Sequence, residues 1–199
     1  MLVQDAKAAE VTSLLNEVVA GRPQAAAQLL PLVYAELRKL AAAQMSRLRP
    51  GDTLQATALV HEAYLKLVGQ ADPGWSGRGH FFGAAAQAMR NLIVDHIRHK
   101  SAAKRGGGQP KAELDDALGA TLVASGGGLS AEDALAVDEA VKRLEAEHPR
   151  KAQVVVMRYF GGLSAEEIAE ALGVTTRTVE REWRFARAYL HAALRGEAG

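Results

Sequence analysis

The sequence contains no cysteine, and this absence removes several classes of function at once. Without thiols there can be no disulfide, no thiolate metal site and no cysteine nucleophile, a composition that suits the cytoplasm. No run approaches about 18 uninterrupted apolar residues, the length that would indicate a membrane span. The charged N-terminus also lacks the apolar stretch of a signal peptide. We therefore expect a cytoplasmic protein with no membrane contact.

Aromatic residues are scarce as well, at 5% of the chain, whereas Ala and Leu are abundant. No segment alternates apolar and polar residues with the period of two that is typical of a strand, so we predict an all-α fold. The apolar content of 48% is enough for a buried core. The expected helices span roughly 6–20, 24–48, 54–69, 79–103, 131–147, 149–160, 164–172 and 175–194.

Charge is low overall but unevenly distributed along the chain, with a formal net charge of +1. Residues 90–111 contain six Lys/Arg and one acidic residue, 112–139 contain seven acidic residues and no Lys/Arg, and 173–195 contain five Arg and two Glu. Two basic blocks separated by an acidic one indicate contacts with a polyanion.

Two glycine-rich runs, "KRGGGQPK" and "ASGGGLSAED", lie around the acidic block. They predict a flexible linker over 106–130 that joins two small helical domains, 1–105 and 131–199. A linker of this length would let the domains sit apart on a larger partner. Glu113, Asp115 and Asp116 within it either imitate nucleic-acid charge or simply keep a tether soluble, and both interpretations stay open.

Near the C-terminus, "GLSAEEIAEALGVTTRTVEREW" has the outline of a helix-turn-helix. Ser164 with Glu167 forms a capping-box pattern, as Ser130 with Asp133 does further upstream. Gly173 suits a left-handed helix end, and Thr175 is a good N-cap. The second helix is expected to bury Val179, Trp183, Ala186 and Leu190 on one face and to present Arg177, Arg181 and Arg184 on the other.

Such a helix could read DNA, because Arg can bond base edges and Thr can reach phosphates from the helix N-terminus. The alternative is an ordinary solvated basic face. The longer segment "PRKAQVVVMRYFGGLSAEEIAEALGVTTRTVEREWRFARAYL" resembles the fourth conserved region of bacterial sigma factors, most of all the extracytoplasmic-function (ECF) group. The resemblance implies binding of the −35 promoter element through Thr175, Thr176, Arg177, Arg181 and Arg184.

A sigma factor also needs a second-region domain, and two N-terminal segments resemble it. "TLQATALVHEAYLKLV" resembles the helix that docks on the polymerase clamp, and "HFFGAAAQAMRNLIVDHIRHKSAAKR" resembles the helix that binds and melts the −10 element. The implied −10 contacts are Trp75, His80, Phe81, Arg90, Asn91, Asp95 and Arg98. By their spacing, Asn91, Asp95 and Arg98 form a polar stripe on this helix, and Arg90 belongs to a basic edge for phosphates. For Phe81, simple core packing remains an alternative.

On the first of these helices, a sector with Leu54, Ala58, Leu65 and Val68 is expected to face inward. A mixed stripe of Gln55, Leu59, Glu62 and Lys66 is then the expected polymerase contact, with one apolar anchor among polar side chains. The chain departs from the family at Ala58, where an acidic residue is common, and at His61, where Gln is common. Clamp binding could thus use different contacts here.

The resemblance implies a non-enzymatic sigma factor without metal or cofactor. Its expected partners are core RNA polymerase, through the beta and beta-prime subunits, and promoter DNA; an anti-sigma protein is a further partner consistent with it. One alternative is a stand-alone helix-turn-helix regulator. The other is a helical metal hydrolase using His61 and Glu62, but the zinc motif His-Glu-x-x-His would need a second His where Leu65 stands.

Overall fold

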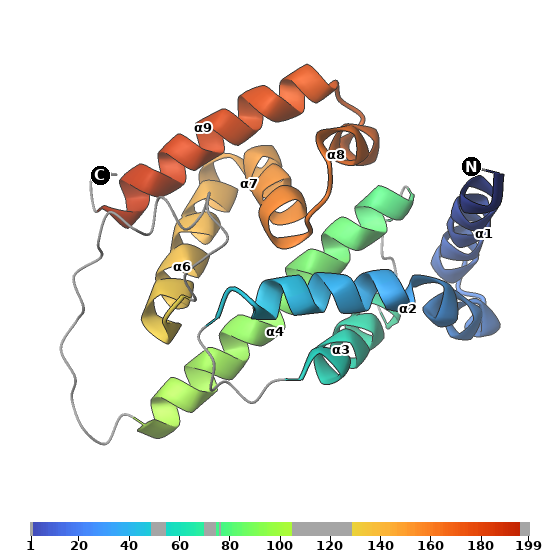
Figure 1. Ribbon diagram of the computed structural model, residues 1–199, viewed down its shortest axis with the longest axis horizontal. Coiled ribbons are helices and arrows are strands. Elements are labelled where there is room, and N and C mark those ends of the chain that lie inside the picture. Colours follow the sequence, from blue (N-terminus) through green and yellow to red (C-terminus); the bar gives the residue numbers. More distant parts are fainter. Residues whose placement is uncertain (1, 49–54, 70–74, 76, 105–128, 196–199) are drawn as a thin grey trace.

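The computed structural model describes residues 2–48, 55–69, 75, 77–104 and 129–195 of the chain. Within these ranges every named element is helical, and the single β-bridge joins Leu48 to Leu129. The predicted all-α fold is thereby confirmed (Figure 1). In the part of the chain so described, no helix is both long and apolar enough to cross a membrane.

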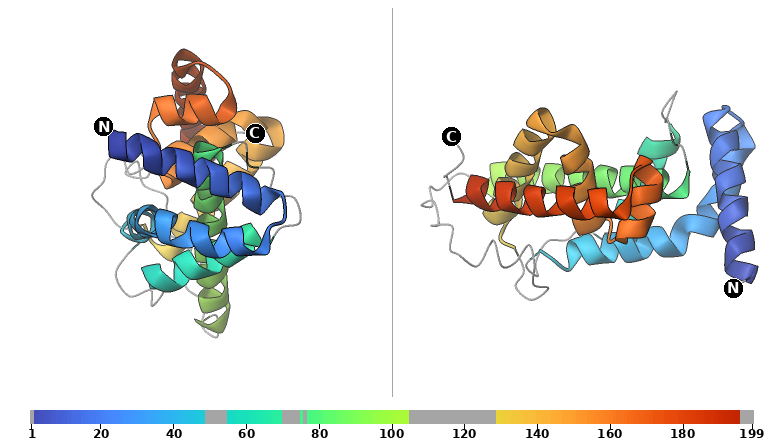
Figure 2. Two further views of the ribbon diagram at one scale, coloured as in Figure 1. Left: turned by 90° about the vertical axis from the view of Figure 1, so that its right-hand side faces the viewer. Right: turned by 90° about the horizontal axis from the view of Figure 1, so that it is seen from above.

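The N-terminal half consists of α1 (Leu2–Val19), α2 (Pro23–Met45), α3 (Ala56–Val68) and α4 (Arg78–Lys104). Gly21, with a φ of 73°, lies in the turn after α1, and Pro23 occupies the first turn of α2, where its missing N–H costs nothing. Their cores form one cluster. Figure 2 shows α1 lying across one end of this bundle.

The C-terminal half consists of α6 (Ala131–Glu147), α7 (Pro149–Val155), η1 (Val156–Phe160), α8 (Ala165–Leu172) and α9 (Thr176–Leu194). The capping boxes expected at Ser130 and Ser164 are both present. The predicted helix over 149–160 is present too, but its last turn, η1, is a π-helix. The widened turn is visible in the bond from the Gly161 amide to the Val156 carbonyl, at 2.8 Å.

Helix α4 is the central element, because it contacts α1, α2 and α3 on one side and α6, η1 and α8 on the other. Phe81, Met89 and Ile97 bury its first face in the N-terminal core. Its second face contains two glycines that permit a close approach. A Cβ at Gly79 would lie 2.9 Å from the Ala171 Cβ, and one at Gly83 would lie 2.5 Å from the Met157 Cε. The two halves of the molecule are therefore packed directly together.

The predicted linker falls mostly on residues 105–128, which lie outside the described part of the chain, together with Glu113, Asp115 and Asp116. The segment that follows returns to the end of α2, where the Leu129 amide donates to the Arg47 carbonyl at 2.6 Å. The expected division into two domains joined by this linker stays a prediction.

Candidate nucleic-acid interface

Helices α8 and α9 form a helix-turn-helix whose ends are set by local sequence. Gly173 ends α8 in the left-handed conformation, with φ 63° and ψ 36°. Thr175 then begins α9 as its N-cap, accepting a hydrogen bond from the Thr178 amide at 3.2 Å. Each of these features was predicted, because an αL glycine and a hydroxyl N-cap satisfy backbone groups that a helix end leaves free.

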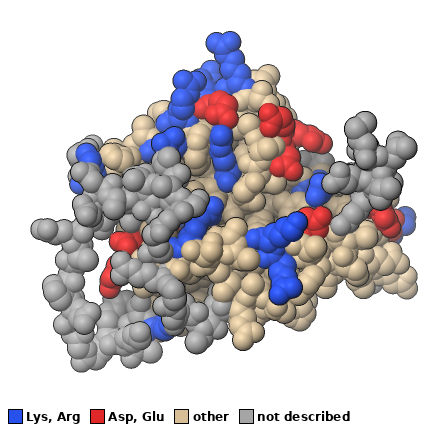
Figure 3. Space-filling view, viewed as in Figure 1, with Lys and Arg blue, Asp and Glu red and all other residues tan. Residues whose placement is uncertain are grey.

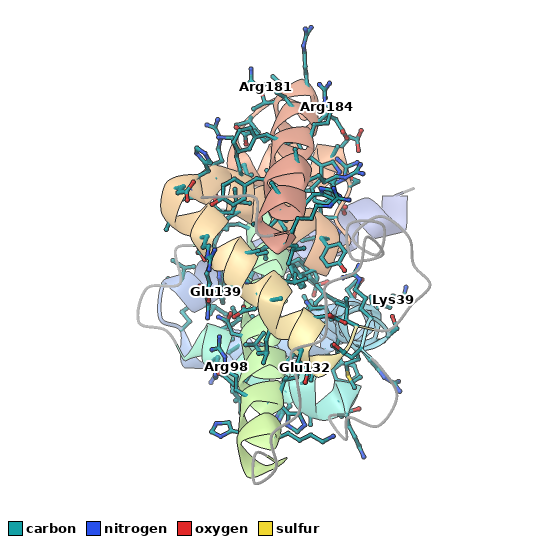
Figure 4. The ribbon with its side chains drawn as sticks, turned by 90° about the vertical axis from the view of Figure 1, so that its left-hand side faces the viewer. Lys39, Arg98, Glu132, Glu139, Arg181 and Arg184 are labelled. Carbon is teal, nitrogen blue, oxygen red and sulfur yellow. The ribbon has the colours of Figure 1, made fainter. Side chains whose placement is uncertain are left out.

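The two faces of α9 are divided as the helical wheel predicts. Val179, Ala186 and Leu190 are buried, and Trp183 is half-buried against the same core. Arg177, Arg181 and Arg184 are exposed on the opposite side, as are Thr175 and Thr176 at the N-terminus. Lys and Arg side chains stand along the edge of the molecule where α9 lies (Figure 3), and Arg181 and Arg184 point outward in Figure 4.

Two carboxylates of α9 are neutralised by arginines from the preceding helices, an arrangement that the wheel did not reveal. Glu182 is buried and accepts from the Arg150 Nε at 2.8 Å, and this bond raises the pKa of Arg150. Glu180 accepts from Arg158 at 2.7 Å, and the Arg158 guanidinium also lies 5.1 Å from the centre of the Trp183 ring. Both carboxylates of α9 are thus paired with arginines of the preceding helices.

On α4, part of the predicted −10 surface is exposed and part is not. Asn91, Asp95 and Arg98 lie on an exposed stripe, as expected from their spacing. The side-chain amide of Gln87, one turn earlier on α4, donates to the Asn91 side-chain oxygen at 3.3 Å. This hydrogen bond orients the Asn91 side chain. His80, at the N-terminal end of the helix, is half-buried.

Trp75 and Phe81 lie in the core instead of at a surface. Their rings meet edge to face at 5.0 Å, and Phe81 makes a second such contact with Phe82 at 5.3 Å. This geometry is favourable for aromatic pairs. Because Trp75 is 5% and Phe81 0% exposed, neither ring is open to a base. Phe81 therefore packs in the core, as the alternative interpretation had it, and Trp75 does so too.

Arg90 was expected on a basic edge, but its side chain is only 2% exposed. It points into the contact between α4 and α6, where its guanidinium lies 2.5 Å from the Asp138 carboxylate and 3.0 Å from the Asp138 carbonyl. Burial lowers the pKa of Arg90, and the nearby carboxylate partly offsets that effect. The expected exposure was wrong because α6, far along the sequence, covers this face of α4.

On α3, three of the four predicted polymerase contacts are exposed: Gln55, Glu62 and Lys66. The exposure expected of Leu59 was wrong, because this side chain is 1% exposed and belongs to the core. The exposed apolar side chain on this helix is Leu65, at 56%, which was assigned to the inner sector. The buried face is instead built from Leu59, Val60, Ala63, Tyr64 and Leu67.

A metal centre finds no support in the arrangement of side chains. Across the described ranges, no group of three or more His, Asp or Glu residues is placed to hold a metal ion. His61 and Glu62 both lie exposed on α3.

A capped helix-turn-helix with an exposed arginine face, among described residues that are helical throughout their named elements, is typical of DNA-binding transcription proteins. Comparison with known families then identifies the group within that class. The model of the family described as "ECF sigma factor" matches residues 8–196, nearly the whole chain. The protein belongs to the ECF sigma factor family, whose members act in promoter-specific transcription initiation. No curated protein matched the sequence.

Proposed function

We propose that the protein binds core RNA polymerase, recognises a two-part promoter and helps to open it, without catalysing a reaction of its own. The observation that carries this proposal is the exposed arginine face of α9 in a chain that also presents the polar stripe of α4. Family membership supports the general role in initiation. The cytoplasm is the proposed site of action, and an anti-sigma protein is a proposed additional partner.

For the −35 element, we assign the contacts to Thr175, Thr176, Arg177, Arg181 and Arg184. The N-terminal end of α9 is the end that a recognition helix inserts into the major groove. Arginine can bond guanine bidentately there, and threonine can meet a thymine methyl group or a phosphate. The pairing of Glu180 with Arg158 and of Glu182 with Arg150 supports this assignment, because it limits repulsion between α9 and the DNA backbone.

For the −10 element, we assign base and backbone contacts to Asn91, Asp95 and Arg98, with His80 at the entrance of the helix. Capture of an unstacked base needs edge hydrogen bonds and a stacking surface, which an exposed polar stripe supplies only in part. Arg90 would join this surface only after α4 separates from α6. Trp75 and Phe81 would join it only after a change in the core.

For the polymerase, we assign Gln55, Glu62 and Lys66 on α3, with Leu65 as the apolar anchor in place of Leu59. An exposed leucine surrounded by polar side chains is the usual composition of a small interface centre and its rim. His61 and Ala58 lie on the same exposed side.

The decisive experiment is run-off transcription with purified core polymerase on a genomic promoter library. We expect transcripts from a small set of promoters only when the protein is present. A stand-alone helix-turn-helix regulator would instead bind DNA alone and give no promoter-specific transcript with core polymerase, which would overturn the proposal. An activity assay with a His61→Ala variant, together with metal analysis, would reveal the remaining hydrolase alternative.

A further inference from the structure

The carboxylate of Asp138 on α6 is only 1% exposed and contacts three cationic side chains. Arg90 of α4 lies 2.5 Å from one carboxylate oxygen, and Arg98 of α4 lies 3.1 Å from the other. Lys142, one turn along α6, is 3.0 Å from that second oxygen. Two of the three cations thus come from the helix that is proposed to bind the −10 element.

The pair of Arg90 and Asp138 is an unusual choice for simple stability. Removing two charges from water costs several kcal/mol, and an apolar pair of similar size is often at least as stable. The pair is also incompletely satisfied, because the Arg90 Nε is buried with no hydrogen-bond partner among the described residues. What the pair does supply is a specific point of contact between α4 and α6.

The contact between the two halves covers the Arg90 side chain, which is only 2% exposed. Gly79 and Gly83 place α4 directly against Ala171 of α8 and Met157 of η1, and Val94 is buried further along the same face. The Arg90 guanidinium is also covered by the Phe160 ring, whose centre lies 5.4 Å away. DNA can reach Arg90 only if the two halves separate.

We propose that Asp138 is an intramolecular substitute for a DNA phosphate, an inference that rests on the function proposed above. Its carboxylate holds Arg90 and Arg98 of the −10 helix and keeps the free protein closed until polymerase and promoter draw the halves apart. Carboxylate and phosphate oxygens present similar acceptors to the planar guanidinium, so the same arginines can exchange one for the other. In the open protein the arginines face the DNA backbone, and Asp138 returns to water.

The closed arrangement would reduce the apparent affinity for promoter DNA. When only a fraction of the molecules is competent to bind, the observed Kd rises by the inverse of that fraction. Any change that opens the protein without altering its DNA-contacting residues should therefore strengthen binding. Because Asp138 is in the contact between the halves and outside the proposed DNA surface, it is the residue at which to make that change.

The first test compares Asp138→Asn with its neighbour Glu139→Gln. Both remove one negative charge from α6, but Glu139 is exposed and pairs only locally, with Arg143 at 3.6 Å. The absence of native cysteine allows fluorophores on Glu10→Cys and Ala188→Cys, two exposed sites on opposite halves. We expect Asp138→Asn to lower energy transfer and to raise the affinity of the free protein for a promoter found by run-off, on the order of tenfold. Glu139→Gln should do neither.

The second test locks the halves with Gly79→Cys and Ala171→Cys. The ideal Cβ at Gly79 lies 2.9 Å from the Ala171 Cβ, and a disulfide needs about 3.8 Å, so a displacement of less than about 1 Å suffices. Oxidation should reduce promoter-specific transcription at least about tenfold, and reduction of the same sample should restore it.

The outcomes separate the two proposals. If the wild-type protein and core polymerase give no promoter-specific transcript, the proposed function fails. If they do, but Asp138→Asn changes neither energy transfer nor affinity, or the oxidised lock transcribes as well as its reduced form, then the closed state held by Asp138 is refuted. The Asp138 comparison remains decisive even where the double cysteine variant folds poorly.

Discussion

Helices α4 and α9 are both basic and both proposed to contact DNA, yet they are buried in different ways. Helix α9 has one buried face, and its arginines at 177, 181 and 184 are exposed on the other. Helix α4 is covered on two faces, so Arg90 is buried while Asn91, its direct neighbour, is exposed. Whether a basic side chain can meet DNA thus depends on what covers its helix, and charge alone does not reveal this.

The difference comes from sequence distance. The helices that cover α9 precede it closely, and its arginine partners, Arg150 and Arg158, lie 32 and 22 residues away. The side chain that captures Arg90 lies 48 residues away, beyond the predicted linker. A helical wheel separates the buried face of a helix from its exposed face. It therefore predicts α9 correctly, but it cannot show that α6 buries a second face of α4.

The largest effect is expected on the inner face of α4, from Phe81→Ala. Phe81 is fully buried and contacts both Trp75 and Phe82, so its removal should leave a cavity and lower the free energy of unfolding by about 3–5 kcal/mol. Urea denaturation followed by circular dichroism measures this. Asn91→Ala, on the exposed stripe of the same helix, should change stability by less than about 0.5 kcal/mol. Similar small effects for both variants would contradict the assignment of Phe81 to the core.

On α9 the expected effect is on binding and leaves folding intact. Arg177→Ala should weaken binding of a −35 duplex by about 1–3 kcal/mol, roughly 5- to 150-fold, if the side chain reads a base. The matched control is Arg187→Ala, which removes the same charge from the side of the helix. Fluorescence anisotropy titrations at fixed salt compare the two. Equal losses would mean that α9 attracts DNA by charge only, and an unchanged affinity for Arg177→Ala would remove it from the site.

Much of the fold could be predicted because its signals are local. Ser130, Ser164, Gly173 and Thr175 mark helix ends through hydrogen bonds to neighbours within a few residues, and all four mark the ends that were expected. The π-helical turn after Val155 has no such signal.

The errors in predicting which side chains are exposed arose where packing between elements far apart in the sequence determines burial. Helix α3 is apolar over most of its circumference, so its pattern does not say which side is inner, and Leu59 and Leu65 were exchanged. Glu182 lies at the edge of the apolar face of α9, and its burial depends on Arg150 from another helix. Arg90 was misplaced for the same reason, since nothing near it in the sequence points to Asp138.

The smallest effect tests the local signals themselves, through the cap of α9. The Thr175 hydroxyl accepts from the Thr178 amide, so Thr175→Ala should leave that donor to water and lower stability by about 1 kcal/mol. Thr175→Ser keeps the acceptor and should restore most of the loss. Gln55 supplies the contrast: it begins α3 without a side-chain cap bond, so Gln55→Ala should have almost no effect on the free energy of unfolding. Thermal or urea unfolding measures these free energies. If Thr175→Ala and Gln55→Ala lower the stability equally, the start of α9 is determined by tertiary packing and not by its cap. Helix α9 would then depend on distant contacts just as the burial of Arg90 on α4 does.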